Sequence, residues 1–238
     1  MAHYTFIPRK RYGFFGSMLS SFPVTWWLII VTVITSIFGF IAVSVWPVSV
    51  DYLFLKPDSI IHGKYLWTLL THMFMHGGFL HLFVNMFALF SLGGLCENII
   101  GRKRMLWLYI SSGIFAGLFT AVLAGFLGDG SLGMRIFGSP NIYMVGASGA
   151  LFAVAGLFVI LLPNVRFSII FLPFFSLPAY VMVPLVLFAV WAITVAAGLP
   201  IGNVAHLGGF LIGIGYGVYL RKKYRRKVAM LDRYFRRY

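Results

Sequence analysis

Long apolar runs separated by short polar or basic segments dominate the pattern along the chain. About 20 apolar residues are enough for a helix to cross the hydrocarbon core of a bilayer. The runs predict six membrane-spanning helices, the fourth and the sixth of them short. These lie at 26–46, 79–96, 104–126, 148–162, 178–197 and 204–220. No run shows the period-2 alternation of a barrel strand, so the pattern predicts an all-α membrane protein.

Two connections between the apolar runs are unusual. The connection 46–78 is long and mixes polar with apolar residues, so we expect it to fold on itself and to lie partly in the membrane interface. The segment 163–177 is apolar, but prolines interrupt it, and proline removes a helix hydrogen bond. We therefore expect an interfacial hairpin on the cytoplasmic side rather than a seventh span.

Composition strengthens the membrane assignment. Hydrophobic residues make up 61% of the 238 residues and charged residues only 10%. Soluble domains are about 45–50% apolar with glycine included, so a water-soluble enzyme is excluded. Cys96 is the single cysteine, which excludes an intramolecular disulfide and any multi-cysteine metal site.

The basic residues fall almost entirely on one side of the predicted topology. Sixteen of the 19 Lys and Arg residues lie in the terminal segments or in the even-numbered loops, and three lie in the remaining loops. Positive loops stay in the cytoplasm, so both termini are expected there, with the spans in the cell membrane. This divides the chain into a cytoplasmic segment 1–23, a core 24–220 and a basic tail 221–238. We interpret the tail as an anchor to anionic lipids rather than a nucleic-acid site.

His81 and Asn85 are polar residues four positions apart within the predicted second span. This spacing places them on one face of a helix, and polar groups inside a span are candidates for function. They are either hydrogen-bond donors to a reacting group or an interhelical pair that holds the bundle together. His72 and His76 lie nearby, but the segment lacks the glutamate of an H-E-x-x-H motif, so no metal site is expected.

Ser148 opens the predicted fourth span between Gly146 and Gly149. A serine at a helix start is either a plain N-cap or a nucleophile. In the second case, the free N–H groups and the helix dipole can stabilise an oxyanion. The glycines would allow a tight turn and the close approach of a substrate backbone.

His206 lies near the start of the predicted sixth span and shares a helical face with Gly209 and Gly213. A G-x-x-x-G pattern permits close contact between helices. The fourth span also carries small residues, so the two helices are predicted to approach until Ser148 Oγ reaches a ring nitrogen of His206.

Acidic residues are absent from the predicted spans, and Glu97 follows the end of the second one. This excludes proteolysis by a membrane pair of aspartates. It leaves Ser148 and His206 as a dyad without an acidic member, in which a neutral His206 would be the general base.

These residues resemble the rhomboid family of intramembrane serine proteases over about residues 24–220. The resemblance rests on the order of His81-x-x-x-Asn85, Gly146-x-Ser148-Gly149 and Ala205-His206-x-x-Gly209-x-x-x-Gly213. It implies the six-helix rhomboid fold with a short central fourth helix. It also implies cleavage of transmembrane protein substrates near the outer side of the bilayer, with no metal or cofactor.

By this resemblance, Ser148 matches the nucleophile and His206 the base. His81, Asn85 and the backbone N–H of Ser148 match the oxyanion donors. Phe152 stands where many members of the family have a tyrosine stacked against the histidine. An inactive rhomboid-like protein that binds transmembrane clients is the alternative, and the intact serine and histidine argue against it.

Three further positions bear on substrate access. Thr68 stands where the family has the arginine of a Trp-Arg pair. Phe188 and Trp191 in the fifth span are bulky enough to act as a lateral gate against the second span. The glycine-hinged loop 198–203 is a candidate lid over the site.

Overall fold

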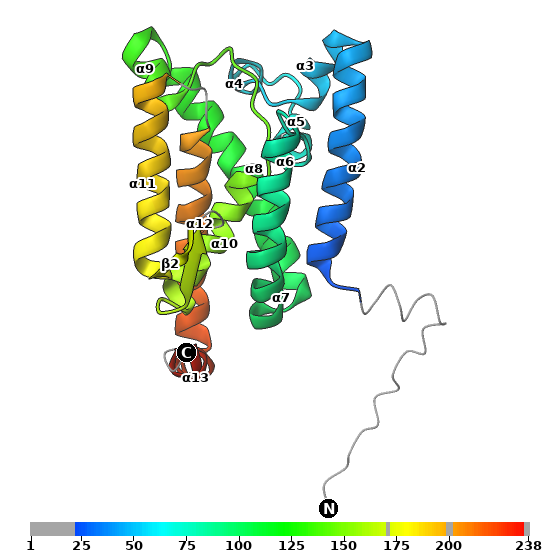
Figure 1. Cartoon of the computed structure of the whole chain (residues 1–238). Coiled ribbons are helices and arrows are strands. Elements are labelled where there is room, and N and C mark those ends of the chain that lie inside the picture. The colour runs from blue at the N-terminus through cyan, green and yellow to red at the C-terminus, as the bar shows by residue number, and fades with distance from the viewer. Residues whose placement is uncertain (1–21, 170–171, 199–201, 236–238) are drawn as a thin grey trace, which may run out of the picture.

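The computed structural model describes residues 22–169, 172–198 and 202–235 of the chain. Within these ranges, five helical runs are long and apolar enough to cross a membrane. They are α2 (Val24–Val45), the run Phe79–Ile100, α8 (Arg102–Leu127), α11 (Ala179–Ala197) and α12 (Asn203–Lys223). Figure 1 shows α2 and α11 at opposite edges of the bundle. The fold is therefore that of a mostly helical, multi-pass membrane protein.

A shorter apolar helix, α10 (Ser148–Leu161), packs against α8, α11 and α12 inside this bundle. Its 14 residues span about 21 Å at 1.5 Å per residue, less than the about 30 Å of a hydrocarbon core. Most of its residues are buried. The count of six spans stays a prediction, because α10 is too short to cross the core by itself.

The run Phe79–Ile100 is continuous but not uniform. It consists of α6 (Phe79–Ala88), a π-helical turn η3 (Leu89–Gly93) and α7 (Gly94–Ile100). The helix thus continues past residue 96, where the second span was predicted to end.

This extension corrects the prediction that no carboxylate lies within a span. Glu97 belongs to α7 and is buried, with 6% of its surface exposed. Its oxygens accept hydrogen bonds of 2.8 Å from the backbone N–H groups of Val24 and Thr25 and from Thr25 Oγ1. The first N–H groups of a helix have no partners within the helix. Glu97 therefore caps α2, and its charge is compensated by the positive end of that helix.

The connection 46–78 folds on itself, as predicted. It forms η1 (Pro47–Ser49), α3 (Val50–Leu53), α4 (Pro57–Ile61), α5 (Thr68–Thr71) and η2 (His72–Phe74). Figure 1 shows α3, α4 and α5 at the same end of the bundle as α9 (Gly130–Phe137). The location of this end in the membrane interface stays a prediction.

The segment predicted to form a hairpin does so, which adds two strands to a fold predicted to be all-α. Strands β1 (Arg166–Ile169) and β2 (Leu172–Pro178) pair in antiparallel fashion. The strands lie at the end of the bundle where α2 begins (Figure 1). The cytoplasmic location predicted for this hairpin stays a prediction.

The basic tail is helical, which the sequence pattern did not indicate. Helix α12 continues to Lys223, past the boundary predicted at residue 220, and α13 (Arg225–Phe235) follows. Val228 of α13 is buried against the core. Figure 1 shows α13 at the end of the bundle where α2 begins. This agrees with an even number of spans, whereas the cytoplasmic side of both termini stays a prediction.

Candidate active site

Helices α10 and α12 pack backbone against backbone. A methyl group on Gly209 would overlap the carbonyl oxygen of Gly149, and one on Gly213 would overlap that of Ala153. A methyl group on Gly149 would in turn come within 2.8 Å of Ala116 Cβ on α8. The glycine face predicted for the last span is therefore the surface on which α10 sits.

This packing brings together Ser148 and His206. Ser148 Oγ lies 2.8 Å from His206 Nε2, which is a hydrogen-bond distance. The Phe152 ring stacks on the His206 imidazole with centroids 4.6 Å apart and planes 28° apart. His206 is buried, and its Nδ1 has no hydrogen-bond partner within the described residues. Stacking and helix packing thus hold the imidazole toward the serine.

The segment before Ser148 is tied to the folded connection 46–78. Met144 and Leu55 form a β-bridge with hydrogen bonds of 2.7 and 3.1 Å. The Gly146 N–H donates to the carbonyl oxygen of His72 over 2.9 Å. Because α10 begins at Ser148 without a side-chain cap, its first N–H groups have no intrahelical partners. Its start is therefore able to receive negative charge.

A hydrogen bond outside the spans reinforces the same junction. The Tyr143 hydroxyl donates to Asp51 Oδ1. The bond to this carboxylate, together with desolvation, raises the pKa of Tyr143 to about 12. The tyrosine therefore stays protonated at neutral pH and remains a donor that links the 139–147 segment to α3.

His81, at the start of α6, accepts a hydrogen bond from the backbone. The Gly77 N–H donates to His81 Nδ1 over 3.4 Å. A neutral imidazole that accepts at Nδ1 carries its proton on Nε2. Gly146 lies beside this edge of the ring, because a methyl group on it would come within 3.0 Å of His81 Nε2. The donor nitrogen therefore lies on the Ser148 side of α6.

Asn85, one turn further along α6, is buried with 4% of its surface exposed. Its Nδ2 donates to the carbonyl oxygen of His81 over 3.1 Å. An amide nitrogen carries two protons, so this bond leaves one N–H of Asn85 for another acceptor. His81 and Asn85 thus share one face of α6, as predicted, and one amide N–H of Asn85 is already bonded to the backbone of that helix.

His76 packs against His81 and hydrogen-bonds to Ser36. We call the group of Ser36, His76, Gly77 and His81 the histidine cluster. His76 Nδ1 lies 2.9 Å from Ser36 Oγ, and the Ser36 hydroxyl is 2.8 Å from the carbonyl oxygen of Phe74. The rings of His76 and His81 meet edge to face with centroids 5.0 Å apart. Desolvation by burial lowers the pKa of His76 to about 3. This imidazole is therefore neutral, and it packs against the ring of His81.

Ser36 and Gly77 were not predicted to belong to the histidine cluster. The paired glycines before the second span were the available signal for Gly77. Ser36 carried no signal, because a serine can bond back to its own helix. Within the described residues, no three His, Cys, Asp or Glu side chains gather closely enough to hold a metal ion.

A family model described as the Rhomboid domain matches residues 63–223, which is more than half of the chain. The chain belongs to the rhomboid family. The matched range contains the segments that carry His81, Ser148 and His206.

Three curated relatives illustrate what this rhomboid is similar to. Rhomboid protein 1, mitochondrial, of Saccharomyces cerevisiae is 29% identical over 204 residues, which are 81% of this chain and 55% of the relative. RHOMBOID-like protein 1 of Arabidopsis thaliana is 34% identical over 175 residues, 71% of this chain and 39% of the relative. The human Presenilin-associated rhomboid-like protein, mitochondrial, is 32% identical over 156 residues, 63% of this chain and 37% of the relative.

The chain thus spans about half the length, or less, of these curated relatives. Two of the three are named as mitochondrial proteins. Location in the cell membrane therefore stays a prediction for this rhomboid, whereas its multi-pass character follows from its helices and its family.

The structure describes most of the positions that were predicted to bear on substrate access. Thr68 is buried, and its hydroxyl donates to the carbonyl oxygen of Tyr65 over 2.8 Å. Phe188 on α11 is 72% exposed, and Trp191 is half-buried. The centre of the predicted lid, 199–201, lies outside the described residues. The gate and the lid stay predictions.

Proposed function

We propose that this rhomboid is a serine protease that hydrolyses peptide bonds in or near transmembrane segments of membrane-protein substrates. The observation that carries the proposal is the 2.8 Å contact between Ser148 Oγ and His206 Nε2. Family membership supports it, because rhomboids are typically intramembrane serine proteases. A nucleophile and a base within hydrogen-bond reach are the signature of covalent catalysis.

In the first step, the Ser148 hydroxyl donates its proton to His206 Nε2 while Oγ attacks the carbonyl carbon of the scissile bond. The carbonyl π electrons move to the oxygen, which gives a tetrahedral oxyanion. His206 keeps its other proton on Nδ1 throughout, so it becomes an imidazolium. The stacked ring of Phe152 lies against this cation, and an aromatic face attracts positive charge.

We propose three donors for the oxyanion. They are the Nε2–H of His81, the second amide N–H of Asn85 and the backbone N–H of Ser148. The bond from Gly77 to His81 Nδ1 supports the required tautomer. Fixed donors of this kind stabilise developing charge, and loss of one costs about 100- to 1000-fold in rate.

Collapse of the oxyanion then breaks the C–N bond as His206 passes its proton to the leaving amine. This leaves an acyl group on Ser148 Oγ and a neutral imidazole. A water molecule donates a proton to His206 Nε2 while its oxygen attacks the acyl carbon. The second tetrahedral intermediate releases Ser148 with its proton restored and a carboxylic acid product.

The start of α10 faces the end of the bundle that carries α3, α4 and α5, because the 139–147 segment is bonded to that connection. The basic α13 lies at the other end (Figure 1). If the basic end is cytoplasmic, as the charge distribution predicts, cleavage takes place toward the outer side. A substrate helix would have to unwind there to present its backbone to Ser148.

The test is labelling of the detergent-solubilised full chain with a fluorophosphonate, which phosphonylates an activated serine. We expect the natural chain to label, Ser148→Ala to remain unlabelled and His206→Ala to label at least 100-fold more slowly. Ser111→Ala is the matched control, because this serine is exposed on α8 and bonds only to its own helix.

An unlabelled natural chain, or equal labelling of Ser148→Ala, would overturn the proposal. If the natural chain also bound a transmembrane peptide without cleaving it, the client-binding alternative would replace the protease.

A further inference from the structure

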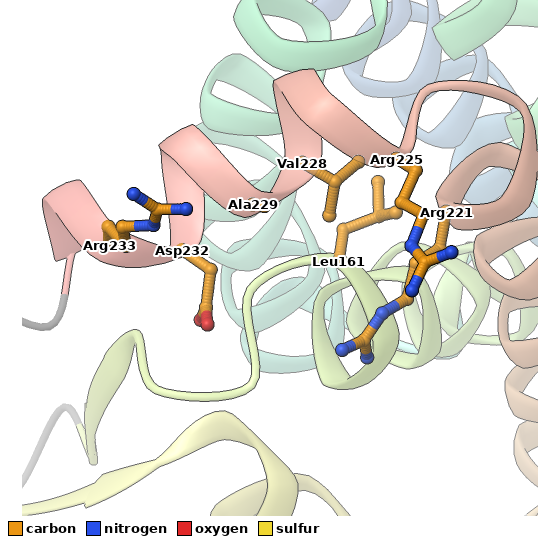
Figure 2. Close-up of a pocket in the computed structure, with 7 residues that line it drawn as sticks. All are labelled: Leu161, Arg221, Arg225, Val228, Ala229, Asp232 and Arg233. Atoms are coloured by element: carbon orange, nitrogen blue, oxygen red, sulfur yellow. The ribbon is translucent and has the colours of Figure 1, made fainter.

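A pocket of about 380 Å³ opens at the end of the bundle opposite α3, α4 and α5. Its lining includes three arginines, Arg221 at the end of α12 and Arg225 and Arg233 on α13. Leu161 and Val228 give it an apolar floor. Figure 2 shows the Arg221 and Arg225 side chains reaching into the same part of the pocket.

The guanidinium groups of Arg221 and Arg225 both keep N–H donors for a ligand. Arg221 donates from one terminal nitrogen to the carbonyl oxygen of Ile160, over 3.1 Å at the end of α10. A guanidinium has five N–H donors, so most of those of Arg221 remain for another acceptor. Arg225 is the first residue of α13 and pairs with no acid among the described residues. Planar forks of this kind match phosphate oxygens.

Asp232 also lines the pocket and is the one acidic residue among its described lining residues. Its Oδ1 accepts a hydrogen bond of 3.0 Å from Asn164 Nδ2, which ties α13 to the connection after α10. Figure 2 shows its carboxylate apart from the Arg221 and Arg225 guanidinium groups. Three arginines against one aspartate leave the lining net positive, with the positive charge concentrated at the end of α12.

We propose that this pocket binds the phosphate group of an anionic phospholipid, held by Arg221 and Arg225. The site lies where a spanning helix ends, which is the depth of lipid headgroups, and basic pockets there are typical headgroup sites. The apolar floor of Leu161 and Val228 suits the glycerol and the first acyl carbons, for which a free phosphate ion has no counterpart. The proposal goes beyond the protease activity and does not depend on it.

The experiment measures phosphatidylglycerol retained by the full chain, by native mass spectrometry from mixed micelles with phosphatidylcholine. Each arginine near an anionic headgroup contributes about 1 kcal/mol, which is about fivefold in affinity. The double variant Arg221→Gln, Arg225→Gln should therefore bind about 30-fold more weakly. The control Lys222→Gln, Arg226→Gln removes the same charge from exposed positions outside the pocket lining and should change binding less than twofold.

Three results would overturn the proposal. Equal loss in the pocket and control variants would assign binding to the charge of the whole tail. Equal retention of phosphatidylcholine would show that no anionic headgroup is selected. Displacement of the lipid by equimolar inorganic phosphate would assign the site to a free anion.

A single substitution keeps the test decisive if the double variant fails to fold. Arg225→Gln breaks no hydrogen bond to the bundle within the described residues, whereas Arg221 also binds the end of α10. Arg225→Gln alone should weaken phosphatidylglycerol binding about fivefold at an unchanged unfolding midpoint. Unchanged binding in this variant would contradict the assignment.

Discussion

Gly146 lies against the edge of the His81 imidazole. A methyl group on Gly146 would come within 2.9 Å of His81 Cε1 and within 3.8 Å of Ser148 Oγ. Its φ of +125° is a backbone conformation that side chains rarely adopt. The His81 ring and the Ser148 hydroxyl therefore approach the same small space, which stays open only because residue 146 is glycine.

Gly146→Ala should therefore impair the site, in addition to straining the backbone at this positive φ. The added methyl group would push His81 away from Ser148, and we expect fluorophosphonate labelling to slow at least tenfold. Gly63→Ala is the matched control, because Gly63 also has a positive φ, +71°, but a methyl group there meets no atom within 4 Å. Gly63→Ala should cost about 1–2 kcal/mol of stability at an unchanged labelling rate. Equal slowing in both variants would contradict the prediction.

His81→Ala and Asn85→Ala should each slow cleavage of a transmembrane reporter about 10- to 1000-fold without abolishing it, since each removes one donor of several. Asn85 already gives one N–H to its own helix, so we expect the smaller loss for Asn85→Ala. The free energy of unfolding should be measured in the same samples. A large loss of stability with unchanged activity per folded molecule would instead support the role of interhelical glue.

Periodicity made the contact of Ser148 with His206 predictable. His206, Gly209 and Gly213 repeat on one helical face, and small residues on α10 face them, so local spacing alone was enough to predict their approach. The cap of α2 was not predictable in this way, because Thr25 and Glu97 are 72 positions apart. The second span was also predicted too short, since the π-helical turn at Leu89–Gly93 carries the helix through Glu97.

Several contacts of the site could not be predicted from the sequence because they are made by backbone groups. The Gly77 N–H donates to His81 Nδ1, and the His72 carbonyl oxygen accepts from Gly146. Neither backbone group has a side-chain signature in the sequence. The helix in the tail was also not predicted, because the dense positive charge indicated only an anchor to anionic lipids, whereas Val228 packs on the core.

Phe152 is expected to position His206 through its ring alone. The ring stacks on the imidazole, and aromatic pairs contribute about 0.5–1.5 kcal/mol beyond burial. Phe152→Leu keeps an apolar side chain without a ring and should slow labelling about 3- to 10-fold. Phe152→Tyr retains the ring and should label within twofold of the natural chain. Equal labelling of Phe152→Leu would show that stacking does not position the histidine.

Glu97→Ala should destabilise the bundle and leave the dyad intact. The substitution leaves the N–H groups of Val24 and Thr25 without their acceptor, and an unsatisfied buried donor costs about 1–3 kcal/mol. We expect a lower free energy of unfolding in a detergent titration, with unchanged labelling per folded molecule. Arg102→Gln is the control, because Arg102 Nε lies 3.6 Å from Glu97 and is partly exposed, so its loss should cost less.

Acid should destabilise the fold through the buried histidines of the 46–78 connection. Desolvation lowers the pKa of His72 to about 4, although its Nδ1 bonds to the Thr68 carbonyl oxygen over 2.8 Å. In the unfolded chain the pKa is about 6.5, so between these values the unfolded state binds more protons. Stability is then fully present above about pH 6.5 and falls as the pH drops toward 4, by about 1.4 kcal/mol per pH unit for each such histidine.

The measurement is the free energy of unfolding between pH 7 and pH 4.5 for the natural chain and two variants. His72→Gln cannot titrate and should remove one histidine's share of the slope, at some cost in stability at neutral pH. His62→Gln is the control, because His62 is exposed and its substitution leaves the buried His72 and His76 in place. His76, whose pKa is lowered to about 3 by burial, should supply part of the slope that remains in His72→Gln. An unchanged slope in His72→Gln would show that the acid sensitivity arises elsewhere.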